Sequence, residues 1–377
     1  MERYFRTFAL KLSSTGVFVA TLCGTLGCKT VLSKNADVLG GKTQCVLLPF
    51  SRNWTQFPTV EHISGFRGTL YVMGDVHGHY SELLELLSRA RVASGTANNP
   101  VWLSGHNILV FIGDLINKGN DSVATLHYVM NLQQAALRSG GRVIVTMGNH
   151  EVSFLADPMG SKTEKLQESA SRAGLNLCRD IHSPNSPIGA WIRNESAAAV
   201  VNGILMSHTG YAYEALPTAW DQKFRPIVES IDWPKSSSNF ACGKNKKGAE
   251  KQGFFNATVW WGKNGDTFRA QQAALGVTTF VFGHDPSAFH EKGKIAAYFG
   301  DPIGSALVKV DTGLGNDVSR GALLKCGTWS PNGSCAKFEV LANPSVPGQG
   351  GTLDFVPLNV VPNPPPDQEE GDPDRDC

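Results

Sequence analysis

The chain has 377 residues, of which 41% are hydrophobic and 18% are charged, and its 34 Lys and Arg against 33 Asp and Glu leave a formal net charge of +1. Ample apolar content with low net charge excludes a disordered chain, and the lack of a basic excess gives no support for nucleic-acid binding. The 40 glycines follow no three-residue period, which excludes collagen.

The first 27 residues have the composition of a secretory signal peptide. A basic segment precedes a run of apolar and small residues that ends near Cys28. Because this run is too short and too polar for a membrane span of about 20 residues, we expect export to the periplasm, cell envelope or medium, without a stable membrane span in the mature chain. The alternatives are an uncleaved anchor, a core helix and lipid attachment at Cys28. Residues 28–65 are predicted to be a linker.

From residue 69 onward, strands and helices are expected to alternate. Three apolar segments rich in strand-forming residues each end in polar residues: 69–75, 107–114 and 142–151. Two segments between them place apolar residues at helical spacing: 81–92 and 123–137. This order predicts an α/β core. Later strands are expected at three further apolar runs: 203–208, 278–284 and 306–312.

Two cysteines delimit a predicted hairpin near the end of the domain. Cys326 and Cys335 flank the turn-rich segment GTWSPNGS between two strand-like runs, so a disulfide between them is the favoured interpretation, with free buried thiols as the alternative. The eight cysteines form no CxxC pair, which argues against a zinc ribbon or a thioredoxin-like motif. Residues 341–377 are rich in proline and then acidic, which predicts a disordered tail.

Residues able to carry chemistry fall where the predicted strands end. The first three strands end in GDVHG, GDLINKG and GNHE, and two later strands end in SHTG and FGHDP. Because ligands bind beyond the carboxyl ends of strands in α/β sheets, we expect these residues to converge on one edge. Taken singly, a Gly-Asp turn or a lone His is a structural feature. Together, carboxylate, imidazole and amide groups form a ligand set for divalent transition metals.

In this order the motifs resemble those of the calcineurin-like metallophosphoesterase superfamily. The match is closest to the phosphoprotein phosphatase type, which carries GDxHG, GDxVDRG and GNHE. GAWIRN at 189–194 and VDTGLG at 310–315 are similar to the bacterial-like branch that includes the Shewanella-like serine/threonine/tyrosine phosphatases. The resemblance spans about residues 66–326 of a domain predicted at 66–340. It implies an α/β (α+β) fold, a four-layer αββα sandwich with a dimetal centre at the carboxyl ends of the strands.

The resemblance also implies a role for each motif residue. Asp75 and His77 would bind one metal and Asp114 would bridge both. The second metal would be held by three more residues: Asn149, His208 and His284. A hydroxide between two divalent ions, which Mn, Fe or Zn could supply, would attack phosphorus in line, and His150 would protonate the leaving oxygen.

Three positions depart from the pattern of the family, and one of them is the HGG-like motif, which reads His208-Thr209-Gly210. Asn117 replaces an Asp that orients the acid histidine, and Lys118 replaces an Arg that clamps phosphate, so phosphate binding should be less geometrically strict. Arg193 and Lys263 are predicted as further phosphate contacts, with structural or surface roles as alternatives.

The sequence therefore predicts an exported dimetal phosphoesterase that acts on phosphate monoesters of a protein or a small molecule. A hydrolase of dinucleoside polyphosphates or nucleotides is the alternative within the same chemistry. A catalytically weak phosphate binder on the same fold is the alternative from another class, and only Asn117 and Lys118 favour it.

Overall fold

A computed structural model of the chain describes its main body and several short segments. The described residues are 11–12, 18–24, 27–33, 45–46, 48–210, 217–229, 243–244, 250–251, 253–257, 272–300, 305–330, 334–342, 355–358 and 360–361. The chain divides into two units, residues 1–47 and residues 48–377, each with its own internal contacts.

The first unit contains a small antiparallel sheet in the order β1-β2-β3. Its strands are β1 (Lys11–Leu12), β2 (Phe18–Gly24) and β3 (Gly27–Ser33). The predicted signal segment falls partly on these strands and partly outside the described residues. Its role in export stays a prediction.

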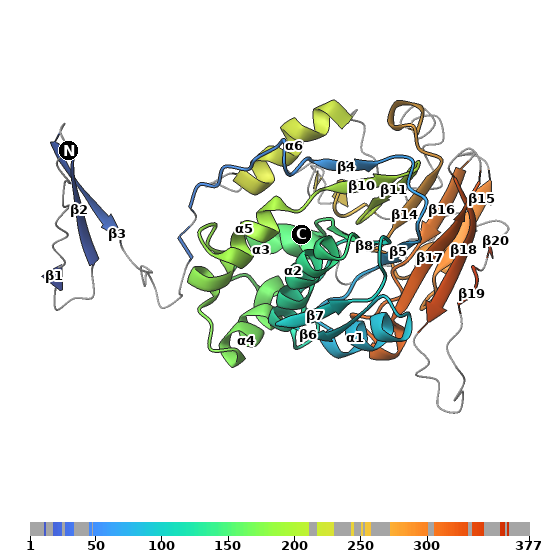
Figure 1. The fold of residues 1–377 in the computed structure, drawn as a ribbon. Coiled ribbons are helices and arrows are strands. Elements are labelled where there is room, and N and C mark those ends of the chain that lie inside the picture. Colours follow the sequence, from blue (N-terminus) through green and yellow to red (C-terminus); the bar gives the residue numbers. More distant parts are fainter. Residues whose placement is uncertain are drawn as a thin grey trace. The chain divides into compact units, whose positions relative to one another are not determined.

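The second unit is built on two larger sheets (Figure 1). The six-stranded sheet has the order β19 (Val356–Pro357), β18 (Cys335–Ala342), β17 (Ala322–Trp329), β5 (Leu70–Met73), β8 (Ile108–Phe111) and β9 (Arg142–Val145). The seven-stranded sheet has the order β20 (Val360–Val361), β15 (Ala296–Gly300), β16 (Ser305–Lys309), β14 (Thr279–Phe282), β11 (Ile204–Ser207), β10 (Ala198–Val201) and β4 (Val60–Ile63). Every strand expected from the sequence is present.

Helices surround this pair of sheets (Figure 1). They are α1 (Tyr80–Arg89), α2 (Ser122–Arg138), α3 (Asn149–Ala156), α4 (Glu164–Arg172), α5 (Pro187–Asn194) and α6 (Pro217–Glu229). Two hairpins complete the elements, β6 (Ala93–Thr96) with β7 (Asn99–Trp102), and β12 (Gly243–Lys244) with β13 (Glu250–Lys251). In the described part of the chain, no helix combines the length and the apolar character needed to cross a membrane.

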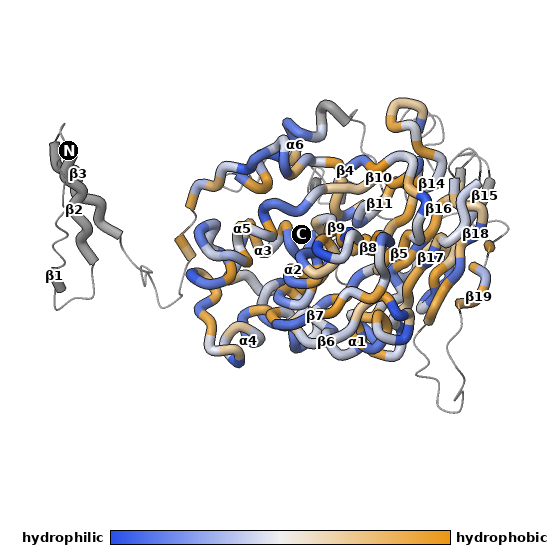
Figure 2. Tube along the Cα trace, in the orientation of Figure 1, coloured by the Kyte–Doolittle hydropathy of each residue, from blue (hydrophilic) through white to orange (hydrophobic). Residues whose placement is uncertain are grey.

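The strands alternate their side chains between two apolar clusters. In β5, Leu70 and Val72 join a cluster that also contains Met206 and Val308 of the other sheet, so this cluster fills the space between the sheets. The side chains of Tyr71 and its alternate neighbours face the helices instead. Because both faces are covered, the parallel strands are apolar along their whole length, and Figure 2 shows hydrophobic residues concentrated along them. This arrangement agrees with the predicted αββα sandwich.

The ordered fold extends beyond the predicted domain at both ends. In the predicted linker, β4 pairs in parallel with β10, and buried Arg52 donates to the carbonyl oxygens of Arg193 and Glu195 at 2.9 and 2.7 Å. In the predicted tail, β19 pairs with β18 and β20 pairs with β15. Apolar residues between prolines supply these short strands, so the prediction of disorder from residue 341 was wrong for 355–358 and 360–361. Residues 362–377 lie outside the described part.

The predicted disulfide is confirmed. Cys326 and Cys335 are bonded, with their Cα atoms 5.9 Å apart, across the hairpin of β17 and β18. Cys45 and Cys178 are disulfide-bonded as well.

Removing the hairpin disulfide should destabilise the protein without changing its active site. Because the bond closes a loop of about ten residues in the unfolded chain, Cys326→Ser with Cys335→Ser should lower the free energy of unfolding by about 2–3 kcal/mol. Urea unfolding under non-reducing conditions measures this change. The reduced wild type serves as the control, and an unchanged midpoint would contradict the expectation.

Candidate metal centre

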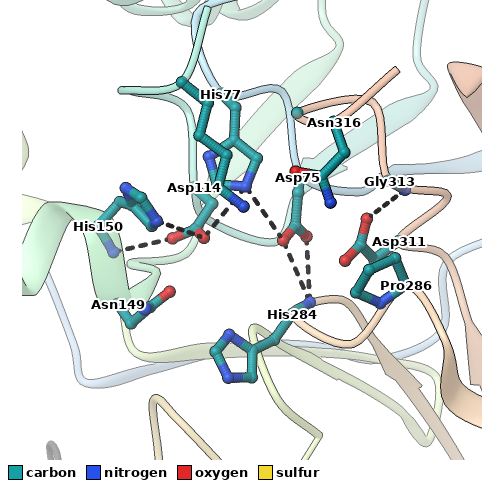
Figure 3. A pocket seen from close by; sticks show the side chains of 12 residues that line it. Asp75, His77, Asp114, Asn149, His150, His284, Pro286, Asp311, Gly313 and Asn316 are labelled. Carbon is teal, nitrogen blue, oxygen red and sulfur yellow. Dashed lines mark hydrogen bonds and ion pairs between the residues drawn. The ribbon is translucent and has the colours of Figure 1, made fainter. Parts of the chain in front are cut away.

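The six predicted metal ligands lie at the carboxyl ends of strands from both sheets. β5, β8 and β9 are parallel in one sheet, and β11, β14 and β16 are parallel in the other. The loops after β5, β8, β9, β14 and β16 line a common pocket (Figure 3), and His208 after β11 lies 2.9 Å from the Asn149 oxygen of that pocket. The ligand residues are Asp75, His77, Asp114, Asn149, His208 and His284, and all have 9% or less of their surface exposed.

Asp114 occupies the middle of this group. Its Oδ2 lies 3.6 Å from His77 Nε2 and 3.5 Å from His208 Nε2. Two sets of side chains have the spacing of a metal site, and Asp114 belongs to both. One contains His77 and His150, and the other contains His208 and His284. A carboxylate in this position can touch two cations at once, as the resemblance implied.

Backbone carbonyls fix which nitrogen of each histidine faces the pocket. His77 Nδ1 lies 3.2 Å from the Ile116 carbonyl oxygen, and His208 Nδ1 lies 3.1 Å from that of Ile112. A carbonyl oxygen can only accept, so each Nδ1 carries the proton and each Nε2 keeps a bare lone pair. Such outer hydrogen bonds orient histidines that bind metals.

Several of these lone pairs face one another rather than donors. The Asn149 side-chain oxygen lies 2.9 Å from His208 Nε2, and His284 Nδ1 lies 3.1 Å from the same atom. With the amide turned over, its nitrogen would instead donate to His208 and Asp114. The amide can thus be satisfied within the chain with its nitrogen inward, or turn its oxygen inward toward a bound cation. The donor set thus fits a divalent metal centre.

Burial keeps the histidines of the pocket neutral at pH 7. It lowers the pKa of His208 to about 3, and it lowers the pKa of His77 and His150 well below the ordinary value. The charge of Lys118 adds to this effect on all three rings. A neutral imidazole has the lone pair that metal binding requires.

The backbone of the site is held in an uncommon conformation. Five site residues have φ between 51° and 70°, in the left-handed region: His77, Asp114, Asn117, Lys118 and His284. A residue with a side chain reaches this region at a cost of about 1–3 kcal/mol, and such residues concentrate at functional sites. The loops are thus bent so that their side chains aim into the pocket.

Glycines allow the carboxylates to lie against the backbone, as expected from the motifs. A Cβ added to Gly148 would lie 2.2 Å from Asp114 Oδ1, and one added to Gly283 would lie 2.2 Å from Asp75 Oδ1. Next to this glycine, the His284 amide donates to both Asp75 oxygens at 3.2 Å. Only glycine leaves room for these contacts.

Glu151 is a positioning residue to which the sequence motif assigned no role. It is buried, and its carboxylate accepts from the backbone N–H groups of Asp114, Leu115 and Gly148 at 2.8, 2.9 and 2.9 Å. These bonds tie the loop after β8 to the start of α3. The sequence signal for Glu151 was its position as the last residue of the GNHE motif.

The predicted acid and its neighbour lie at the side of the pocket. His150 Nε2 is 4.0 Å from Asp114 Oδ2, and Asn117 Nδ2 is 3.1 Å from His150 Nδ1. Lys118, Asp311 and nine other residues line the same pocket as His150. The sequence therefore located Asn117, Lys118 and His150 correctly, whereas it gave no role to Asp311.

Of the two other predicted phosphate contacts, Arg193 is described by the structure and does not line the pocket. Arg193 is 5% exposed, and its Nη1 donates to the carbonyl oxygens of His182 and Gly189 at 2.6 and 3.0 Å. Its guanidinium is thereby used to hold α5 against the preceding segment, so the prediction that it binds phosphate was wrong. Lys263 lies outside the described residues.

Comparison with known proteins places the chain among phosphoesterases. A family model described as calcineurin-like phosphoesterase matches residues 68–288. The chain is 33% identical to a symmetrical bis(5'-nucleosyl)-tetraphosphatase of Buchnera aphidicola, over 40% of this chain and 46% of the relative. It is 28% identical to Shewanella-like protein phosphatase 2 of Arabidopsis thaliana, over 31% of this chain and 32% of the relative. It thus spans less than half the length of either relative.

A solved structure has a similar fold. It is a cold-active protein tyrosine phosphatase, which superposes with a TM-score of 0.60 at 18% identity over 90% of this chain and 95% of the other. At this identity the likeness shows the fold alone.

The close approach at Gly283 gives a test of the site. Gly283→Ala would place Cβ against Asp75 Oδ1, which must move, so the variant should lose at least half of its bound metal while it remains folded. Metal analysis of the reloaded protein measures this loss. Gly327→Ala, whose Cβ would meet only the end of the Lys325 side chain at 3.3 Å, is the matched control. Full metal content in Gly283→Ala would contradict the expectation.

Proposed function

Because the chain belongs to the calcineurin-like phosphoesterase family, we propose that it is a metal-dependent hydrolase that cleaves phosphate monoesters. The observation that carries this proposal is the convergence of the five other predicted metal ligands and His150 around Asp114. Two divalent ions in such a centre activate water and neutralise phosphate charge. Both a phosphorylated protein and a phosphorylated small molecule meet these requirements.

The side chains of this chain have separable tasks in the proposed reaction. Asp114 holds the two halves of the centre together, and its neighbours fix the ions. Lys118 lines the pocket and supplies a point charge to the phosphate, without the bidentate fork of an arginine. His150 is close enough to the pocket centre to donate a proton to the leaving oxygen.

The pairing of His150 with Asn117 favours a second candidate, the hydrolysis of phosphoanhydrides. The Asn117 amide nitrogen can donate to Nδ1, while its oxygen is buried and has no hydrogen-bond partner among the described residues. The proton of the neutral ring then sits on Nε2, toward the pocket. A neutral imidazole is a weaker acid than an imidazolium, so leaving groups that need little protonation should react best. These are aryl oxygens and the phosphates of nucleoside polyphosphates.

We further propose that residues 1–27 direct export, as their composition predicts. The disulfide of Cys326 with Cys335, and the disulfide-bonded state of Cys45 and that of Cys178, support an oxidising compartment. Lipid attachment at Cys28 would retain the protein at the cell envelope. N-terminal sequencing of the native protein tests this proposal, which fails if residue 1 is retained.

A substrate panel tests the proposed activity. Protein loaded with Mn²⁺ should hydrolyse p-nitrophenyl phosphate, a phosphotyrosine peptide, a phosphoserine peptide or diadenosine tetraphosphate, and should act poorly on bis(p-nitrophenyl) phosphate. Asp114→Asn should lower turnover by at least 10²-fold, since it weakens the bridge between the ions. Protein with full metal content and no turnover of any substrate would contradict the proposal and favour a phosphate-binding role.

Asn117→Asp should change which leaving groups react. Its carboxylate would accept from Nδ1–H and favour the imidazolium, which is the stronger acid. General acid catalysis contributes about 10²–10⁴-fold, so the kcat for phosphoserine relative to p-nitrophenyl phosphate should rise by about tenfold. Asn117→Ala, which leaves Nδ1 without either partner, should not raise the ratio. An equal ratio in the wild type and Asn117→Asp would contradict the expectation.

A further inference from the structure

Asp311 is a buried carboxylate of the pocket that has no role in the proposed reaction. It follows β16 and is 4% exposed, and it lines the pocket together with Asp75 and Asp114. Figure 3 places its side chain beside Asp75, on the side away from Asp114. The motif VDTGLG, which contains Asp311, indicated only a similarity to the bacterial-like branch of the family.

The Asp311 carboxylate is only half satisfied by the protein. One oxygen, Oδ1, accepts from the Gly313 N–H at 2.8 Å. Among the described residues, no hydrogen bond or ion pair reaches the second oxygen. A buried carboxylate is stabilised when it is paired with a cation or binds a metal. The charges of Lys118 and Lys309 act on Asp311, and its second oxygen could bind a cation in the pocket.

The backbone brings Asp311 to Asp75 across the junction of the two sheets. A Cβ added to Gly74 would lie 2.5 Å from the Val310 carbonyl oxygen and 3.2 Å from the Asp311 nitrogen. Asp75, which follows Gly74, and Asp311, which follows Val310, are therefore neighbours. The loop after Asp311 also covers the ring of His77, because a Cβ at Gly315 would lie 2.4 Å from His77 Cδ2.

The charges of this side of the pocket are unbalanced. Three buried carboxylates line it, Asp75, Asp114 and Asp311, and Lys118 is the one lysine or arginine among the residues that line this pocket. The charges of Asp311 and Asp114 both repel that of Asp75. A cation between Asp75 and Asp311 would remove this repulsion.

We propose that Asp311 is a seventh metal-ligating side chain, which shares with Asp75 and His77 the ion on their side of Asp114. This proposal rests on the proposed dimetal centre. It makes the two sides of the centre chemically different. The Asp311 side offers three carboxylates and one imidazole, whereas the other side offers two imidazoles, one amide and the shared carboxylate. Oxygen-rich sites suit Mn²⁺ or Mg²⁺, and imidazole-rich sites suit Zn²⁺.

Metal binding by full-length Asp311→Asn tests the proposal without any assay of turnover. The protein is stripped with a chelator and titrated with Mn²⁺, and the bound ions are counted. We expect one Mn²⁺ site to weaken by at least tenfold, while the remaining binding, including that of Zn²⁺, changes less than twofold. Asp317→Asn is the matched control, because it removes the same charge from the same loop but its side chain contacts Ser319 and Arg320 instead.

Equal Mn²⁺ affinities in the wild type, Asp311→Asn and Asp317→Asn would overturn the proposal, and a changed KM with unchanged metal binding would identify Asp311 as a substrate contact. If Asp311→Asn does not fold, anomalous diffraction from the wild type with Mn²⁺ decides. An ion within bonding distance of Asp311 supports the proposal, and an ion bound only by the other ligands overturns it. Wild-type protein that binds metal but turns over no substrate would refute the proposed function and leave this result intact.

Discussion

The structure depends on the burial of lone pairs that face one another. Asp114 presents a carboxylate to the bare Nε2 atoms of His77 and His208. In water these acceptors would each bind donors, but in a pocket with little exposure they cannot. A divalent cation bound between these acceptor atoms would attract all of them and so remove their mutual repulsion. The arrangement is thus a site made for metal, and the chain must hold it together by other means.

Those means are the two sheets and the apolar cluster between them. Parallel strands that end at the same edge bring the loops together, and the sheets prevent the loops from relaxing. The left-handed residues of these loops cost about 1–3 kcal/mol each, and Glu151 spans two loops with three hydrogen bonds. Packing of residues such as Val72 against Val308 keeps this strained edge in place.

Family membership fixes the metal chemistry and leaves substrate preference to the residues that differ. Here an amide replaces a carboxylate behind His150, and a point charge replaces a fork at Lys118. The first change would make His150 a weaker acid, and the second would make phosphate binding less geometrically strict. Together they support the proposal that substrates whose leaving group is already a stable anion react best.

The sequence by itself predicted the strands that carry the site and the six candidate ligands that follow them. Strand periodicity is local, and a polar residue directly after a buried strand must lie at a sheet edge. The tertiary structure decided which basic residue reaches the pocket. The Arg193 guanidinium donates to carbonyl oxygens of its own region, whereas Lys118 lines the pocket. The tertiary structure also brought Asp311 beside Asp75 and added the strands at 356–357 and 360–361 to the sheets. These outcomes depend on how two sheets and distant segments meet, and no local pattern of residues encodes that contact.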